Sequence, residues 1–253
     1  MQTVIEYTKT IFYAVLIAAV FRTLFLQPYY IPSGSMKETF LIGDFLFVNK
    51  MAYGYSRYSC PFAICPISGR LFGSEPERGD VIVFRHPTNG EDYIKRLIGL
   101  PGDRINLSDG VLHINGEPMP QTAAGQFSEP YARQSRTGMV PRCATRSGNP
   151  EECLKDRYIE EFPESGGHVI LNIADQSSDN TPVYLVPDGH YFFMGDNRDN
   201  SIDSRVRQTF GGVGMVPFEN LIGRAEWIVF SSSGRSLLQF WNWRSDRFFK
   251  AVQ

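Results

Sequence analysis

The sequence predicts a mainly β protein preceded by one N-terminal transmembrane helix. The content of 23 glycines, 16 prolines and 13% aromatic residues suits a turn-rich β fold better than a helical bundle. An apolar run lies near the N-terminus, and short apolar segments bounded by turn residues follow it. With 42% hydrophobic residues in 253, the chain can bury a core of useful size. The net charge of −2 argues against a nucleic-acid-binding protein, which needs a basic surface.

The first expected element is a transmembrane anchor over residues 7–26, which follows an N-terminal tail of residues 1–6. Residues 11–21 contain no charged or strongly polar side chain. Twenty helical residues span about 30 Å, which is the thickness of a bilayer core. A cleaved signal peptide and a buried helix of a soluble protein are the alternatives, and no clear small-residue cleavage site follows the run. The few flanking charges do not predict an orientation.

The first half of the remaining chain contains four expected strands. Residues 43–55 are apolar and aromatic and are bounded by glycines. Residues 80–85 and 92–99 are apolar runs separated by a Thr-Asn-Gly turn signal. Residues 110–114 lead into Asn-Gly, a dipeptide that is typical of hairpin turns.

The second half begins with a polar segment and ends with three expected strands. Residues 118–166 are polar with scattered Pro, Gly and charges, so we expect an insertion of lower order. Residues 183–186 and 190–194 are short apolar strands, and residues 224–230 form the last one. A serine-rich hinge and an aromatic tail follow.

The four cysteines form two close pairs in the sequence, Cys60 with Cys65 and Cys143 with Cys153. This spacing fits two local disulfides in an oxidising compartment and does not fit a zinc ribbon. Four free thiols are the alternative, because sequence alone does not establish connectivity.

The first candidate catalytic residue is Ser35, in a turn directly after the anchor. Because Ser35 follows a glycine, its hydroxyl can be exposed while its backbone N–H points at a developing oxyanion. Ser33 can supply a second donor. Taken alone, a Pro-Ser-Gly-Ser run is more often an ordinary surface turn.

The second candidate is Lys95, which strand alternation places on one face with Tyr93 and Leu97. Burial between such neighbours favours the neutral amine and lowers a reference pKa of about 10.4. A neutral lysine can take the proton of a serine hydroxyl. The alternative is an edge-strand lysine that opposes aggregation.

The third candidate segment, residues 195–205, is dense in polar groups after an apolar strand. Asp203 and Arg205 can form an ion pair that fixes the loop, and Ser201 can orient a nearby amine. An Asx-rich loop without a catalytic role is the alternative.

Five segments together make the chain similar to a known family. They are PSGSM at 32–36, GDFLFVNKMAYG at 43–54, RGDVIVFRHP at 78–87, DYIKRLIGLPGD at 92–103 and GDNRDNSIDSR at 195–205. In this order they resemble bacterial type I signal peptidases, the membrane-bound Ser-Lys endopeptidases. The resemblance implies an antiparallel β module around an SH3-like barrel over residues 27–253. It also implies a variable second subdomain inserted within residues 104–190.

The resemblance also implies the catalytic roles. Ser35 would be the nucleophile and Lys95 the general base, and Ser33 would form the oxyanion hole with the Ser35 backbone N–H. Ser201 would lie beside the lysine amine. Two further residues would support the loop, Asp203 and Arg205. No metal or organic cofactor is expected.

The implied substrate is the signal-peptide region of exported preproteins, with small residues at −1 and −3. An extended peptide of this kind can add to a strand edge and place alternate side chains in pockets. The sequence departs from the family at Lys37, Glu38 and Phe40, which concerns the shape of those pockets. The residues expected to wall the pockets are Tyr29, Ile31, Met36, Phe40 and Ile94.

The resemblance places the chain in the bacterial inner membrane as a single-pass monomer with a periplasmic catalytic domain. Because Ser35 follows the expected anchor closely, the site should lie near the bilayer surface. Aromatic residues of the tail can either lie among the headgroups or cap the β core. Those residues are Phe240, Trp241, Trp243, Phe248 and Phe249.

Other functions fit the sequence less well. A metal-dependent phosphoesterase is suggested by Asp196 and Asp199 but lacks enough histidine, aspartate and asparagine ligands in suitable motifs. A Ser-His-Asp hydrolase would be expected to carry G-x-S-x-G, which does not occur. A non-catalytic tethered β module would be expected to lack Ser35 or Lys95, and both are present.

Overall fold

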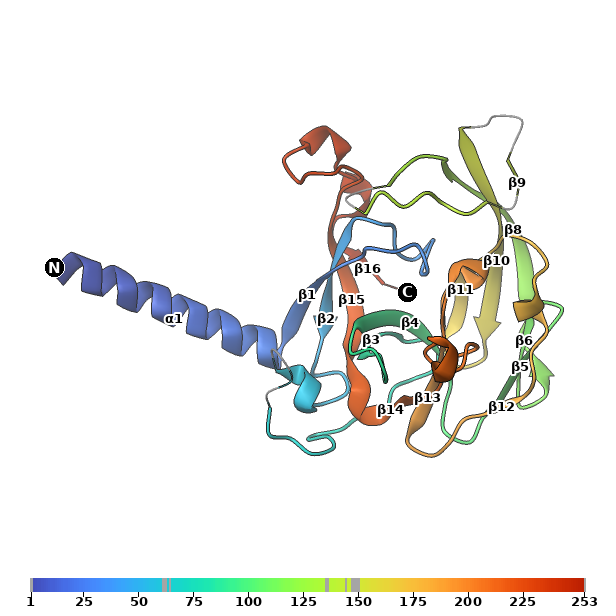
Figure 1. Ribbon diagram of the computed structural model, residues 1–253, viewed down its shortest axis with the longest axis horizontal. Helices are drawn as coiled ribbons and strands as arrows, with labels where there is room; N and C mark the ends of the chain where they lie inside the picture. Colours follow the sequence, from blue (N-terminus) through green and yellow to red (C-terminus); the bar gives the residue numbers. More distant parts are fainter. Residues whose placement is uncertain are drawn as a thin grey trace.

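The computed structural model describes residues 2–60, 63, 65–134, 137–143, 145, 146 and 151–252. The remaining residues of the predicted insertion, 135, 136, 144 and 147–150, lie outside that description. The chain forms one helix followed by a body of antiparallel strands, as the sequence predicts (Figure 1).

Helix α1 (Gln2–Leu24) projects away from the β body and meets it only at its C-terminal end (Figure 1). Its segment Val4–Leu24 is apolar and long enough to cross a membrane, and none of it is buried by the rest of the protein. The helix ends at Leu24 rather than at Leu26, because Leu26 already pairs with Asn49 as the first residue of a strand.

The largest sheet carries both candidate catalytic residues. Its strands follow the order β1-β2-β15-β3-β4-β13-β14, and β16 pairs with the outer part of β15. The bounds are β1 (Leu26–Tyr30), β2 (Asp44–Asn49), β3 (Val81–Arg85), β4 (Asp92–Gly99), β13 (His190–Met194), β14 (Val216–Pro217), β15 (Leu221–Ser231) and β16 (Lys250–Ala251).

Two smaller sheets are built from residues 104–185, between β4 and β13 in the chain. They lie together on the side of the molecule opposite α1 (Figure 1). One has the order β11-β10-β8 with β9 on β10, and the other has the order β12-β5-β6-β7. The bounds are β5 (Arg104–Ser108), β6 (Val111–Ile114), β7 (Glu117–Pro118), β8 (Gln121–Pro130), β9 (Thr145–Arg146), β10 (Glu152–Phe162), β11 (Gly166–Asn172) and β12 (Tyr184–Leu185).

Short 3-10 helices and disulfides complete the described structure. Both cysteine pairs are disulfide-bonded, Cys60 to Cys65 and Cys143 to Cys153. The helices are η1 (Arg57–Ser59), η3 (Ser177–Asp179), η4 (Arg198–Asn200), η5 (Gln208–Phe210), η6 (Phe218–Asn220), η7 (Phe240–Asn242) and η8 (Ser245–Arg247).

The expectation of lower order in residues 118–166 was wrong for its described part. This segment contains β8 and β10, which pair with each other, and β10 also pairs with β11. The polar side chains are not all solvated, because Glu129, Lys155 and Glu160 are buried and paired with opposite charges. Hydrophobic patterning misses strands whose inward residues are charged and mutually neutralised.

The core explains why residues 81–84 are a continuous apolar run. Val81 and Val83 pack in a cluster with residues of β2 and β15, whereas Ile82 and Phe84 pack in a second cluster with residues of β13. Strand β3 is therefore buried on both faces. It is the direct neighbour of β4 and holds that strand rigidly in the middle of the sheet.

Candidate active site

Two side chains from distant parts of the chain meet beside strand β4 of the large sheet. Lys95 Nζ lies 2.6 Å from Ser35 Oγ, a hydrogen-bond distance. Ser35 belongs to the turn between β1 and β2, and Lys95 lies on β4 opposite Ile82 of β3. Both residues are buried, with 8% and 4% of their surface exposed. A hydroxyl and an amine in contact and shielded from water have the arrangement that nucleophile–base catalysis requires.

Burial sets the protonation of this pair. It lowers the pKa of Lys95 to about 8, although the nearby carboxylates of Asp203 and Asp196 oppose the shift. At pH 7 an amine of pKa about 8 is neutral in about a tenth of molecules, against roughly 0.03% for an unshifted lysine. The Lys95 amine also lies 5.7 Å from the centre of the Tyr93 ring and donates to the Ile94 carbonyl.

The turn that carries Ser35 is held by the loop after β13. Asn197 donates its backbone N–H to the Ser35 carbonyl at 3.0 Å and its side-chain amide to the Gly34 carbonyl at 2.8 Å. Gly195 allows this approach, because a Cβ there would lie 2.5 Å from the Ser35 carbonyl oxygen and 2.3 Å from the Ser201 hydroxyl. The loop therefore fixes the position of the turn that carries Ser35.

Ser33 and Ser201 lie in the same cleft as the pair. The cleft has a volume of about 500 Å³ and is lined by residues 32–35, 91–95 and 199–202 together with Met139 and Arg142. The Ser201 oxygen lies close enough to Asp203 to lower the pKa of that carboxyl. Among the described residues, this buried Ser201 oxygen has no hydrogen-bond partner at acceptable geometry. The hydroxyl can therefore still form a hydrogen bond with a nearby group.

Asp203 and Arg205 lie beneath the loop rather than in the cleft. Arg205 Nε and Nη2 each donate to the Asp203 carboxylate at 2.9 Å, and Asp203 also accepts the Gly195 backbone N–H at 3.0 Å. Burial alone would raise the pKa of Asp203, but Arg205 holds it below the ordinary value. The ion pair thus fixes the loop and places a carboxylate near Lys95.

One edge of β4 is open toward the cleft. Strand β3 pairs with residues 92–96, whereas β13 pairs on the other side only from Arg96 onward. No described strand covers residues 92–95 on that side, and residues 91–95 line the cleft. An extended peptide can therefore add there as a further strand.

The five residues expected to wall specificity pockets share one hydrophobic cluster. Only Ile94 among them lines the cleft directly. Tyr29 donates its hydroxyl to Asp92 at 3.1 Å at the end of β4. The buried members of the cluster are Ile31, Met36 and Phe40, and the half-buried ones are Tyr29 and Ile94.

A buried charge cluster next to the nucleophile turn was not predicted. Glu129 of β8 accepts from Lys37, which is two residues after Ser35, and from Lys155 of β10. Gln134 joins it, accepting from Lys37 at 2.9 Å. Burial alone would raise the pKa of Glu129, but the two ammonium groups hold it below the ordinary value. The only feature of the sequence that pointed to this cluster was the departure from the family pattern at Lys37. The partners of Lys37 are too distant in sequence to be inferred.

A second missed connection ties the loop to the small sheets. Arg198 forms an ion pair with Glu160 of β10, and both side chains are buried. On the far side of the loop, Arg96 makes two 2.8 Å hydrogen bonds to the Asp196 carboxylate. The motif at 195–205 thus joins the large sheet to the small sheets through buried ion pairs.

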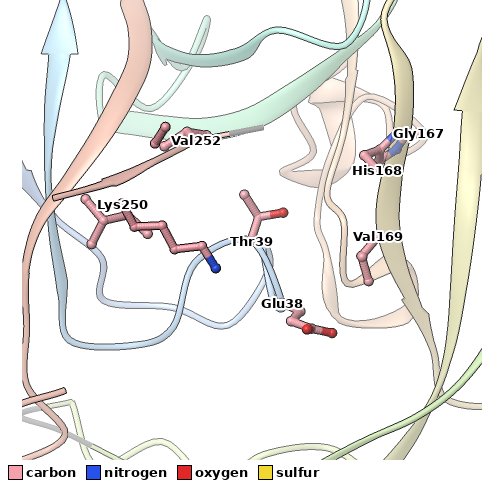
Figure 2. A pocket seen from close by; sticks show the side chains of 9 residues that line it. Glu38, Thr39, Gly167, His168, Val169, Lys250 and Val252 are labelled. Atoms are coloured by element: carbon pink, nitrogen blue, oxygen red, sulfur yellow. The ribbon is translucent and has the colours of Figure 1, made fainter. Parts of the chain in front are cut away.

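A separate cavity of about 160 Å³ is lined in part by residues that follow Ser35 closely in the chain (Figure 2). Glu38 and Thr39 line one side and the Lys250 amine points toward them from β16 (Figure 2). Neither Ser35 nor Lys95 lines this cavity, whereas both line the cleft described above.

The tail aromatics differ in how they pack. Phe248 and Trp243 pack against Phe230 of β15, with ring centroids 5.1 Å from it in both cases. Phe240 and Trp241 are largely exposed. Part of the tail therefore caps the sheet, and part presents apolar surface to the outside.

Comparison with known proteins identifies the family. The model of the family described as "Signal peptidase, peptidase S26" matches residues 4–230. The chain belongs to the signal peptidase family. It is 40% identical over 242 residues to a signal peptidase I of Rickettsia typhi, covering 91% of this chain and 82% of that protein. It is 38% identical over 241 residues to a signal peptidase I of Rickettsia canadensis, with the same coverage.

A solved signal peptidase I from Enterococcus faecalis matches with 24% identity and a TM-score of 0.31. The match covers 60% of this chain and 97% of that one. Membership of the signal peptidase family favours a serine peptidase over a phosphoesterase or a non-catalytic β module.

Proposed function

We propose that this chain is a membrane-bound endopeptidase that removes signal peptides from exported preproteins, with Ser35 as nucleophile and Lys95 as general base. The observation that carries the proposal is the 2.6 Å contact between the buried Lys95 amine and the Ser35 hydroxyl. Family membership supplies the reaction class and the substrate class.

In the first half of the reaction, Ser35 Oγ attacks the carbonyl carbon of the scissile peptide bond. Neutral Lys95 accepts the hydroxyl proton as the new C–O bond forms. The protonated lysine then gives that proton to the leaving amine, so the C–N bond breaks and the mature chain departs with a free N-terminus. The signal peptide remains as an ester on Ser35.

In the second half, water replaces the leaving amine. Lys95, neutral again, takes a proton from the water as the water oxygen attacks the ester carbonyl. When the C–O bond to Ser35 breaks, Lys95 returns that proton to Ser35 Oγ, and the signal peptide leaves with a carboxyl group that ionises in solvent. The negative oxygen formed in each half is stabilised by the Ser35 backbone N–H and the Ser33 hydroxyl. Removing one such donor in other hydrolases costs about 10²–10³ in kcat.

The substrate would lie along the open edge of β4, with alternate side chains directed toward the cluster around Ile94. Bulky residues close to that edge leave room only for small side chains at −1 and −3. The family's preference for such residues fits this arrangement.

The membrane helix would confine the enzyme and its substrate to one surface. Ser35 follows the end of α1 at Leu24 by only a short strand and turn. Signal peptides held in the same bilayer would meet the cleft at a raised effective concentration. We place α1 in the bacterial inner membrane and the β body on its periplasmic side, where the two disulfides are stable.

The proposal is tested with the full chain in detergent and one purified exported precursor. Wild-type protein should cut the precursor once, after a small residue at −1, and mass spectrometry should locate the cut at the signal-peptide junction. Ser35→Ala, which removes only the hydroxyl oxygen, should leave the precursor intact. Cleavage by Ser35→Ala at the wild-type site and rate would refute the assignment of the nucleophile.

A further inference from the structure

The catalytic cleft has a second wall that comes from the segment between β8 and β9. Met139 and Arg142 line the same cleft as Ser35 and Lys95. Met139 is 45% exposed, and Arg142 is also exposed. Apolar and cationic side chains thus face the space in which a substrate would lie, although the segment is far from the catalytic motifs in sequence.

This wall is fixed to the body at two described points and closed by one hydrogen bond of its own. Gln134 bonds through its side chain with Lys37 and Glu129, close to the nucleophile turn. Gln134 also donates its backbone N–H to the Met139 carbonyl at 2.9 Å. At the other end, the disulfide of Cys143 ties the segment to β10. The wall is therefore built into the fold.

Arg142 is held in place beside the catalytic loop. Its Nη1 donates to the Asp199 backbone carbonyl at 3.0 Å, and Asp199 lies in η4, which follows Asn197. Among the described residues Arg142 forms no ion pair with the Asp199 carboxylate, which is buried and accepts the backbone N–H groups of Ile173 and Ala174 through one oxygen. The guanidinium keeps donors for a further acceptor.

The opposite end of the cleft is acidic. Glu91 and Asp92 line it and are exposed, at the start of β4. The two ends belong to different parts of the fold. Asp92 is hydrogen-bonded to Tyr29 of β1, the strand that follows α1. Arg142 instead contacts Asp199, whose carboxylate accepts the Ile173 N–H just after β11, on the side opposite α1 (Figure 1).

The membrane determines which end receives the signal peptide. Tyr29, near the end of α1 in the chain, hydrogen-bonds to Asp92. A signal peptide anchored in the bilayer would therefore enter at the Asp92 end. The residues after the scissile bond would then pass Arg142.

We propose that Arg142 forms a subsite for an acidic side chain within the first residues of the mature protein, and so ranks substrates by charge. The proposal rests on the function proposed above. A carboxylate there would accept a charge-assisted hydrogen bond from the guanidinium, whereas a lysine would be repelled. Because the site is open to solvent, the effect is modest and decreases with salt.

The test uses three precursor peptides that differ only at the second residue after the cut, with Glu, Gln or Lys. Wild type should cut them in the order Glu, Gln, Lys, with about a three- to fivefold change in kcat/KM per step at low salt. Arg142→Gln should remove the ranking, and Arg142→Glu should reverse it. Arg104→Gln, on an exposed site of β5 outside the cleft, should keep the wild-type ranking.

Each contrary result has a distinct meaning. If no peptide is cut, the proposed function fails. If all three are cut at equal rates by wild type, or if Arg142→Glu slows all three equally, the charge subsite is wrong while the proposed function stands. Moving the three substitutions to the fifth residue before the cut, beside Glu91 and Asp92, should remove the preference for Glu or reverse it, and an undiminished preference for Glu there would overturn the assigned direction.

Discussion

Replacing Lys95 with methionine is expected to reduce kcat by about 10³- to 10⁴-fold, because the Ser35 hydroxyl loses the group that accepts its proton. Methionine matches the length and volume of the lysine stem. It also removes the free-energy cost of burying an amine, so the folded state should be as stable as wild type or more stable. Initial rates with a precursor peptide, measured beside urea unfolding, separate the two effects.

Lys50 provides a matched control for this substitution. It is also buried, and burial lowers its pKa to about 8, but its amine donates to the Ser59 backbone carbonyl rather than to a serine hydroxyl. Lys50→Met should therefore retain kcat even if stability falls. Turnover by Lys95→Met close to the wild-type rate would remove the lysine from the mechanism. An equal loss of kcat in Lys50→Met would show that the effect is not specific to the catalytic pair.

Replacing Glu129 with alanine is expected to reduce the free energy of unfolding by about 3–5 kcal/mol. The glutamate is the common partner of Lys37 and Lys155, which are both buried. Without it, the two lysine ammonium groups remain buried, and among the described residues no other carboxylate forms an ion pair with either of them. The loss should appear as a lower urea midpoint with an unchanged slope.

A triple variant distinguishes pairing from packing at this cluster. Lys37→Met, Glu129→Leu and Lys155→Met together remove the charges and keep the volume, so most of the lost stability should return. If Glu129→Ala stays within about 0.5 kcal/mol of wild type, the cluster is not the constraint described here. If the triple variant is as unstable as the single one, packing rather than charge explains the loss.

The β fold was predictable where one face or both faces of a strand are apolar. Residues 92–99 and 190–194 form β4 and β13 with the predicted bounds, and residues 81–85 form β3. Strand β10 was not predictable, because its buried residues include Lys155 and Glu160, which are polar in any hydropathy count. The free-energy cost of burying these charges is offset only by oppositely charged partners on other segments, and sequence does not reveal those partners.

The roles of the candidate catalytic residues could be predicted from the sequence, but most of the residues that line and support the cleft could not. Ser35 and Lys95 were identified through the resemblance, and the structure brings them into contact. Asn197 lay inside a recognised motif, yet the sequence did not reveal that it hydrogen-bonds to the turn that carries Ser35. Nothing in the sequence indicated that Arg142 lines the cleft, since a single arginine in a polar segment cannot be distinguished from a solvated surface charge.

The pH dependence of kcat/KM tests most directly whether a neutral lysine activates the serine. With the pKa of Lys95 lowered to about 8 by burial, kcat/KM should reach a plateau above that pH. Below it, the rate should fall about tenfold per pH unit as the amine is protonated. Circular dichroism over the same range confirms that the protein stays folded. A rate that stays constant from pH 9 to pH 6 in folded protein would contradict the account.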